Sequence, residues 1–535
     1  MVRLIKRGRQ IGVVTVFMVI VYIPFVFTVC SWVSGRMFDI SLHGYTDTVE
    51  RAEFTWKNLC SGEFQEKYAN WIDTNVKPRG VMIHLYNTLR YNLFNQASRP
   101  IANNGDIISP TYLLEKFCIG TDYDYSIPEN KNEMDMFIEE LKAIQQKLYQ
   151  HGKRLFVYIA PSKADWDYES IPSKYVNMKG KDSIRMYDCF KTAISKTDIV
   201  YMDCDELYSV LEYPAFYSTG IHWSRTFEQK ASAEIIEKLS ELTGNKYRKI
   251  LLGDVQEDTL PFWRDSDVFD LANIWNRRNE TYYEYTEVRE QSDFNKLRIL
   301  LYGDSFGEGL CKDVLDRYSF EDIFYINYNN YVRTRYEEKK KINKDWNNMD
   351  FAYYLDRSDV VVIEMTKPNI GQYSCGFTTA LNSALDSYVA GSTLQKHLIE
   401  LNPSDETASW NAEDVLGLYG REAGFVWAKK DSQVILDAEA IKNEGGGLEI
   451  DYSVPGQLQG QTVIVWVNGR VVAERTYEQG MEDKIVITAD QLPDDINDSY
   501  EIEIACSNYF VPSLLSESAD NRELAICIRY IGEVR

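Results

Sequence analysis

Ser305 has the residue type and the setting of a catalytic nucleophile. It lies in Gly-Asp-Ser-Phe (303–306), directly after the apolar run LRILLYG (297–303), and Gly307 and Gly309 open the next segment. If the run is a strand and the segment a helix, Ser305 stands at the carboxyl edge of a sheet. The helix N-terminus then offers backbone N–H groups to a developing oxyanion. The structural alternative is a serine that only caps the helix.

His222 is the candidate for the base that a serine nucleophile needs. Imidazole suits proton transfer near neutral pH, provided that it lies within hydrogen-bonding reach of the hydroxyl. The chain has 5 histidines: His43, His84, His151, His222 and His397. Among them, His222 alone lies in a short polar turn before a helix within the region where strands and helices alternate. A histidine that only stabilises this turn is the structural alternative.

A sheet must bring these two residues together, and the sequence predicts one. Short apolar runs typical of buried strands occupy 155–161, 198–204, 297–303, 322–328 and 359–365. Segments with helical spacing or helix signals lie between or before them, at 132–151, 182–196, 225–241, 307–318 and, strongly charged, 334–356. This alternation predicts an α/β domain whose mostly parallel sheet has helices on both faces. Chemistry in such sheets takes place at the carboxyl ends of the strands.

The pattern changes after about residue 410. An Asn-Gly pair at 468–469 divides the apolar stretch 462–474, which is a strong hairpin signal, and residues 484–488 alternate with period two. We predict an antiparallel β-sandwich over 412–535, joined to the α/β domain by the polar linker 401–411.

The N-terminus is typical of a membrane anchor. Residues 1–10 are basic, and residues 11–33 carry no charge. At 1.5 Å per residue this run reaches about 34 Å, enough to cross a hydrocarbon core about 30 Å thick. The basic flank predicts a cytoplasmic tail and an extracellular location for the rest of the chain. A cleaved signal peptide is the alternative, but the run is long for one and no A-x-A cleavage site follows it.

Composition argues against nucleic-acid binding, a His-rich metal site and a CxxC site. The chain has 81 acidic and 58 basic residues, a formal charge of −23, which disfavours nucleic acid as a partner. So few histidines disfavour a His-rich metal site, and we expect no metal and no cofactor. None of the 9 cysteines forms a CxxC pair, so free thiols are expected.

The motifs around Ser305 and His222 resemble those of a known family. Gly-Asp-Ser-Phe at 303–306, with Ile-His-Trp at 221–223 ahead of it, is similar to the SGNH hydrolase-like family of alginate O-acetylation proteins (the AlgX/AlgJ group). Further resembling segments lie at 61–94, 153–166 and 171–175. The resemblance covers about residues 50–370. The C-terminal unit looks like β-sandwich modules appended to bacterial surface-polysaccharide enzymes, which suggests carbohydrate binding or an inert structural role.

The resemblance implies that Ser305 is the nucleophile and His222 the general base, but it leaves the catalytic acid open. The family pattern places Asp two residues before the histidine, where this chain has Gly220. Either a Ser–His dyad acts alone or another acid takes that place. Asp203 and Asp205, at the end of the strand predicted at 198–204, are the nearest candidates in the sequence, and solvation of a strand end is their alternative role.

The oxyanion donors are also open. The backbone N–H of Ser305 is the first candidate. Polar residues at or after the end of the strand predicted at 322–328 are further candidates, although an ordinary loop role is the favoured alternative for each: Asn327, Asn329, Asn330, Arg333 and Arg335. Trp223 and Tyr331 are candidates for stacking against a sugar, and packing is their alternative role.

Together these observations predict a membrane-anchored, extracytoplasmic O-acetyltransferase with an SGNH-like domain over 34–400. By the resemblance, its acceptor is a hydroxyl of an exported polysaccharide, and it works beside a multi-spanning membrane O-acyltransferase that supplies the acetyl group. Two alternatives remain. One is an acetyl-esterase on the same glycan, and the other is a non-catalytic glycan-binding or assembly protein that has lost the acid.

Overall fold

The structure is a computed structural model of the 535-residue chain. It describes residues 2–34, 39–44, 53–94, 101–104, 107–110, 125–171, 173–177, 184–275, 280–290, 293–318, 321–329, 331–334, 340–342, 345–394, 396–408, 410, 413–441, 446–493, 499–516 and 518–535.

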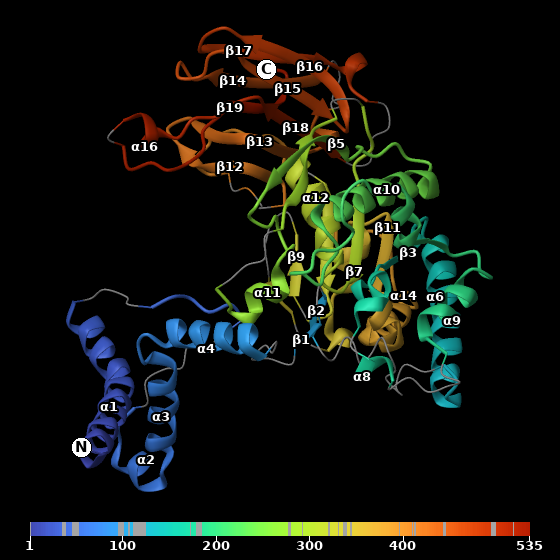
Figure 1. The fold of residues 1–535 in the computed structure, drawn as a ribbon. Coiled ribbons are helices and arrows are strands. Elements are labelled where there is room, and N and C mark those ends of the chain that lie inside the picture. The colour runs from blue at the N-terminus through green and yellow to red at the C-terminus, as the bar shows by residue number, and fades with distance from the viewer. Residues whose placement is uncertain are drawn as a thin grey trace.

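A seven-stranded sheet forms the centre of the molecule, in the order β10-β9-β8-β7-β11-β3-β4 (Figure 1). Its strands are β3 (Arg154–Ala160), β4 (Val200–Asp203), β7 (Arg298–Gly303), β8 (Asp322–Asn327), β9 (Tyr331–Arg333), β10 (Lys340–Lys341) and β11 (Val360–Thr366). The strands from β8 to β4 are parallel, while β9 and β10 add an antiparallel edge. The predicted mostly parallel sheet is therefore confirmed, and its strands form within a few residues of the predicted runs.

Both faces of this sheet are buried under helices. Side chains alternate along β3, so Leu155 and Val157 enter one core while Phe156 and Tyr158 enter the other. The main covering helices are α6 (Pro128–Gln150), α9 (Met186–Ile194), α10 (Arg225–Thr243), α12 (Gly307–Arg317) and α14 (Phe377–Leu385). Helices α6, α9 and α14 cover the face with Leu155, and α10 and α12 cover the other (Figure 1).

The charged helix predicted over 334–356 is wrong for most of the described residues of that segment. Among its described residues, Lys340–Lys341 form the edge strand β10, and only Phe351–Asp356 form an α-helix, α13. The Glu/Lys-rich run 337–345 lacks the apolar stripe that a helix needs to pack against a sheet.

A hairpin that the sequence did not predict follows α10. Its strands are β5 (Leu251–Asp258) and β6 (Tyr282–Val288), and the short helix α11 (Asp267–Ala272) lies in the long connection between them. Helix α4 (Arg79–Phe94) holds α11 from the N-terminal side, because Asn87 Nδ2 donates to the carbonyl of Ala272 at 2.8 Å. This connection therefore has a fixed place in the fold.

The C-terminal unit is an eight-stranded antiparallel sheet with its own core, at one end of the molecule (Figure 1). Its strands are β12 (Val415–Glu422), β13 (Phe425–Asp437), β14 (Gly447–Val454), β15 (Gln461–Val467), β16 (Arg470–Tyr477), β17 (Met481–Thr488), β18 (Ser499–Cys506) and β19 (Ile526–Glu533). We predicted a sandwich of two sheets, and that detail is wrong. The strands form one hydrogen-bonded sheet that curls until its edges meet, and Arg475 on β16 donates to Asp483 on β17 at 2.5 Å. The predicted domain limits, and a carbohydrate-binding role for this unit, stay predictions.

The remaining elements are short or N-terminal. They are α2 (Trp56–Ser61), α3 (Glu63–Asn75), the hairpin of β1 (Ile101–Asn104) and β2 (Ile107–Pro110), α7 (Lys163–Trp166), α8 (Ser173–Val176), α15 (Ala438–Ile441) and α16 (Pro512–Leu515).

The predicted membrane segment 11–33 lies within helix α1 (Val2–Ser34). No helix in the described part of the chain combines the length and the apolar character that a membrane crossing requires. Several side chains of segment 11–33 lie outside the described residues. The anchor therefore stays a prediction.

Candidate active site

Three side chains form a continuous hydrogen-bonded chain at the carboxyl edge of the central sheet. Ser305 Oγ lies 2.7 Å from Nε2 of His222, and His222 Nδ1 lies 2.8 Å from Oδ2 of Asp267. An ionised carboxylate only accepts hydrogen bonds, so Nδ1 carries the proton and Nε2 is free to accept from the serine hydroxyl. This is the hydrogen-bond order of the serine–histidine–aspartate triad. The structure thus brings together the two residues that the sequence singled out and adds a third.

Asp267 is held as an anion. Burial alone would raise the pKa of its carboxyl, but the electrostatic interaction with the His222 ring, hydrogen bonds from that ring and from the Ile221 amide, and the charge of Arg264 hold that pKa below its ordinary value. The Ile221 N–H donates to Oδ1 at 2.9 Å. One carboxylate therefore orients both the ring of His222 and the backbone beside it.

Gly220 explains how the carboxylate reaches His222 from a distant segment. A Cβ at position 220 would lie 2.6 Å from the carbonyl oxygen of Asp265, closer than real Cβ atoms approach an oxygen. The missing side chain lets the residues before α11 lie directly against the turn that carries His222. Phe269 N–H donates to the carbonyl of Thr219 at 2.9 Å across the same contact. Glycine at position 220 therefore allows Asp267, from the segment at the start of α11, to reach His222.

Asp203 and Asp205, the acids suggested by the sequence, are used elsewhere. Asp203 is fully buried, accepts a hydrogen bond from Tyr187 Oη at 2.6 Å and pairs with Lys191. Asp205 pairs with Lys367. Neither is the partner of His222, so the hypothesis that one of them is the catalytic acid is wrong. Asp267 begins a short helix after an irregular connection, and nothing in its local sequence marks it.

A buried lysine fixes the turn 217–222, here called the His222 turn. Lys163 Nζ donates to the carbonyl oxygens of Tyr217, Ser218 and Gly220 at 2.7, 3.0 and 2.7 Å. Lys163 follows β3, in the segment APSKADW whose resemblance to the family was noted from the sequence. Its ammonium group thereby ties the His222 turn to the carboxyl end of a central strand.

The Asp304 carboxylate holds the turn that carries Ser305 through several hydrogen bonds. One oxygen of its carboxylate accepts from the Phe306 N–H at 3.0 Å, and the other accepts from Thr366 Oγ1 and Asn369 Nδ2, both at 2.7 Å. The Asp304 N–H in turn donates to Glu364 at 2.7 Å. Burial raises the pKa of Glu364 well above its ordinary value, and the nearby charge of Asp304 adds to this shift. These four hydrogen bonds of Asp304 thus fix the backbone on either side of the nucleophile.

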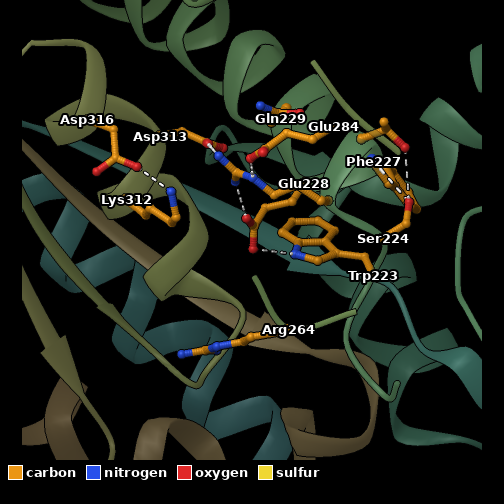
Figure 2. Close-up of polar contacts among 12 residues, drawn as sticks. Trp223, Ser224, Phe227, Glu228, Gln229, Arg264, Glu284, Lys312, Asp313 and Asp316 are labelled. Atoms are coloured by element: carbon orange, nitrogen blue, oxygen red, sulfur yellow. Dashed lines mark hydrogen bonds and ion pairs between the residues drawn. The ribbon is translucent and has the colours of Figure 1, made fainter. Parts of the chain in front are cut away.

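An ionic network joins the two helices that follow His222 and Ser305. Arg225, on the first turn of α10, pairs with Glu228 at 2.5 Å, Glu284 at 2.7 Å and Asp313 of α12 at 2.6 Å. Figure 2 shows the carboxylates of Glu228, Glu284 and Asp313 gathered around one guanidinium group beside Trp223. A Cβ at Gly309 would lie 2.1 Å from Glu228 Oε2, so glycine at this position leaves room for the Glu228 side chain of α10 against the first turn of α12. The ion pair of Arg225 with Asp313 and this contact together join α10 to α12, the helices that follow the two catalytic turns.

The structure distinguishes candidates for oxyanion donors that are available to a ligand from candidates that already have partners. Within the described part of the chain, the Ser305 N–H makes no hydrogen bond, so it can donate to a ligand. Asn327 is buried and engaged, since Nδ2 donates to Tyr325 Oη at 2.5 Å and Oδ1 accepts from the Asn329 N–H at 2.9 Å. Asn330 and Arg335 lie outside the described residues.

The two predicted stacking residues are held by acidic side chains. Trp223 is buried, and its indole N–H donates to Glu228 at 3.2 Å (Figure 2), so packing is its role. Tyr331 Oη donates to Glu308 at 3.3 Å, and Arg333 lies 3.7 Å from the same carboxylate.

Arg264 is a site residue that the sequence did not indicate. Its Nη1 lies 3.4 Å from Nε2 of His222 and donates to the carbonyl oxygen of Ser305, while Nη2 pairs with Glu308. In the described part of the chain, no group of three or more His, Cys, Asp or Glu side chains is placed to hold a metal ion.

The comparisons with known proteins give structural neighbours but no family. No family model matches the sequence, and no curated protein matches it. The chain is similar to AlgX from Pseudomonas aeruginosa at 14% identity and a TM-score of 0.33, covering 81% of this chain and 94% of that one. PatB1 from Bacillus cereus with a sulfonyl adduct matches at 12% identity and 0.31, covering 45% and 90%. The O-acetyltransferase domain of AlgJ from Pseudomonas putida matches at 14% and 0.29, covering 50% and 94%.

The AlgX/AlgJ resemblance noted in the sequence thus also appears among solved structures. At these scores it carries no argument about activity, so the functional proposal depends on the geometry of the site.

Proposed function

We propose that this chain is a serine-dependent O-acetyltransferase in which Ser305 is the nucleophile, His222 the general base and Asp267 the orienting acid. The single observation that carries the proposal is the chain of contacts from Ser305 Oγ through His222 to Asp267, at 2.7 and 2.8 Å. A hydroxyl that can pass its proton to a neutral, oriented imidazole is an activated nucleophile.

The first half-reaction acetylates the serine. Ser305 Oγ attacks the carbonyl carbon of an acetyl ester while its proton passes to His222 Nε2, and the π electrons move to the carbonyl oxygen. Collapse of this intermediate breaks the bond to the leaving oxygen, which takes the proton from Nε2. The product is acetyl-Ser305.

The second half-reaction transfers the acetyl group. A sugar hydroxyl gives its proton to Nε2 as its oxygen attacks the acetyl carbon, and Ser305 leaves with that proton. Water in place of the sugar gives ester hydrolysis by the same residues. The choice between transferase and esterase therefore depends on how the acceptor is held and how well water is excluded.

The wider setting of this proposal comes from the sequence. The uncharged run 11–33 supports an anchor in the cell membrane with the site outside the cell, and the family resemblance supports a polysaccharide acceptor. A multi-spanning membrane O-acyltransferase is the proposed source of the acetyl group. The alternative of a protein that has lost its acid depended on Gly220, and the contact of Asp267 with His222 removes its main argument.

Turnover of p-nitrophenyl acetate by the purified full chain tests the proposal. Wild type should release nitrophenolate and show a transient mass increase of one acetyl group. Ser305→Ala and His222→Ala should each abolish both signals. Ser266→Ala is the matched control, because this neighbouring hydroxyl bonds to Asp270 at 2.9 Å and not to the triad.

Unchanged activity in Ser305→Ala and His222→Ala would refute the proposal. Adding neutral and acidic oligosaccharides to the active protein then separates the two reactions: an acetylated sugar identifies a transferase, and free acetate alone identifies an esterase.

A further inference from the structure

Arg264 places a positive charge beside Ser305 and His222. The proposed roles of the three triad residues do not involve this charge. Its Nη1 lies 3.4 Å from His222 Nε2, the atom that also lies 2.7 Å from Ser305 Oγ. The same guanidinium donates to the carbonyl oxygen of Ser305. Its side chain is 19% exposed, so it lies at the rim of the site, where a substrate can reach it.

The acidic side chain of Glu308 holds this guanidinium in place. Glu308 is on the first turn of α12, its side chain is only 2% exposed, and it pairs with Arg264 Nη2. Tyr331 Oη steadies the same carboxylate at 3.3 Å. Arg264 is thus fixed to the turn of the nucleophile, although it comes from the connection before α11. Figure 2 shows the Arg264 side chain in an extended conformation.

The backbone beside Arg264 is strained. Trp263 has a φ of 46°, in the left-handed region that a bulky side chain rarely adopts, and its ring lies 5.1 Å from the Arg264 guanidinium. Such strain persists only where the surroundings impose it, and it gathers at functional sites. This is a second observation, independent of the hydrogen bonds, that the position of Arg264 is specifically maintained.

Proton transfer changes what the guanidinium can bind. In the resting state Nε2 has one lone pair, and the serine hydroxyl at 2.7 Å is its closer donor. Once Nε2 has taken the serine proton it has no lone pair and carries positive charge, so it repels Arg264. The carbonyl oxygen of the attacked ester gains a full negative charge in the same step. A cation beside that oxygen gains attraction only as the transition state forms.

We propose that Arg264 is a further catalytic residue, which donates an N–H and its positive charge to the oxyanion together with the Ser305 N–H. This inference is built on the proposed acyl transfer at Ser305. The chemical step is the one proposed above. The bond from Ser305 Oγ to the acetyl carbon forms, the π electron pair moves to the carbonyl oxygen that faces Arg264, and the serine proton goes to His222 Nε2. When the pair returns, the leaving oxygen departs and takes that proton.

The test measures kcat and KM for p-nitrophenyl acetate, and inhibition by methylboronic acid, on the full chain. This boronic acid forms a tetrahedral anion on a serine and so imitates the charged intermediate. Arg264→Met and Arg264→Gln should each lower kcat by about 10²- to 10³-fold, the usual effect of removing one oxyanion donor, with little change in KM. Inhibition by the boronic acid should weaken in parallel.

Two further variants separate charge from structure. Arg264→Lys keeps the charge and should recover at least about tenfold of the lost kcat relative to Arg264→Met. Lys312→Met is the matched control, since Lys312 Nζ also lies near the Trp263 ring, 5.2 Å from its centroid, without touching His222, and the variant should stay within about twofold of wild type.

The outcomes are distinct. Wild-type kcat in both Arg264→Met and Arg264→Gln overturns the role of Arg264. A loss of kcat with unchanged boronate inhibition also overturns it, because a merely structural arginine gives that result. Full activity in Ser305→Ala instead refutes the acyl-transfer proposal itself. If Arg264→Met does not fold, the comparison of Arg264→Lys with Arg264→Gln still decides.

Discussion

The carboxylate of Asp267 lies 2.8 Å from Nδ1 of His222, although 45 positions separate the two residues in the chain. The contact exists because Gly220 lets one segment lie against another, and because α4 holds α11 through Asn87. The acid of this site is therefore supplied by tertiary packing, and not by the turn that carries the histidine.

Asp267→Asn should lower kcat by about four orders of magnitude, as loss of the orienting carboxylate does in a serine triad. The amide can donate to Nδ1 and so favours the wrong tautomer of His222. Steady-state turnover of p-nitrophenyl acetate measures the effect. Asp270→Asn, on the same short helix, should stay close to wild type. A loss of this size in Asp203→Asn or Asp205→Asn, with Asp267→Asn active, would show that the acid has been misassigned.

Gly220→Ala should reduce both stability and activity. The added Cβ would meet the Asp265 carbonyl oxygen at 2.6 Å and force the segment before α11 away. Overpacking of this kind costs about 1–3 kcal/mol, and displacing Asp267 should lower kcat at least about tenfold. Denaturant unfolding and ester turnover measure the two effects.

Gly420→Ala is the control for that substitution, because a Cβ at 420 meets nothing within 4 Å. If Gly220→Ala behaves like Gly420→Ala, the close approach of the two segments is not needed for the site.

The sequence was sufficient for the parts of the site that have local patterns. Ser305 follows a continuous apolar strand and precedes a glycine-opened helix, and His222 precedes the helix α10, so both positions could be placed at one edge of a sheet. Asp267 and Arg264 have no such pattern. They lie in a connection between two hairpin strands, and their position depends on which segments pack together.

For the C-terminal unit, too, the sequence predicted the strands but not their three-dimensional arrangement. Period-two alternation predicted its strands, but it does not determine whether two sheets face each other or one sheet curls. That difference depends on contacts between strands far apart in sequence, such as Arg475 with Asp483 across the two edges.

Asp265 should make the stability of the fold depend on pH. Burial raises its pKa to about 8, while an unfolded aspartate has a pKa near 3.9. Between about pH 4 and pH 8 the folded chain therefore binds one more proton than the unfolded chain. By linkage, this residue's contribution to the free energy of unfolding falls as the pH rises, by about 1.4 kcal/mol per unit, and levels off above about pH 8.

Asp265→Asn imitates the protonated side chain and tests this dependence. The variant should match wild type near pH 4 and become more stable than wild type toward pH 8, by a few kcal/mol. Urea unfolding at several pH values measures the difference. A gap that does not change with pH would show that the carboxyl of Asp265 is not neutral in the folded chain.

Lys163→Met should weaken catalysis through the position of His222. Three carbonyl oxygens of the His222 turn would lose their shared donor, at a cost of about 1–3 kcal/mol for a buried group left unpaired. A small displacement of the imidazole should lower kcat by about 10²-fold. Lys153→Met is the matched control, because Lys153 donates to the Ser358 carbonyl at 2.7 Å beside the opposite end of the same strand. It should lose stability yet keep the turnover of its folded fraction. Equal kcat in the two variants, measured on folded protein, would mean that Lys163 supports the fold alone and does not position the base.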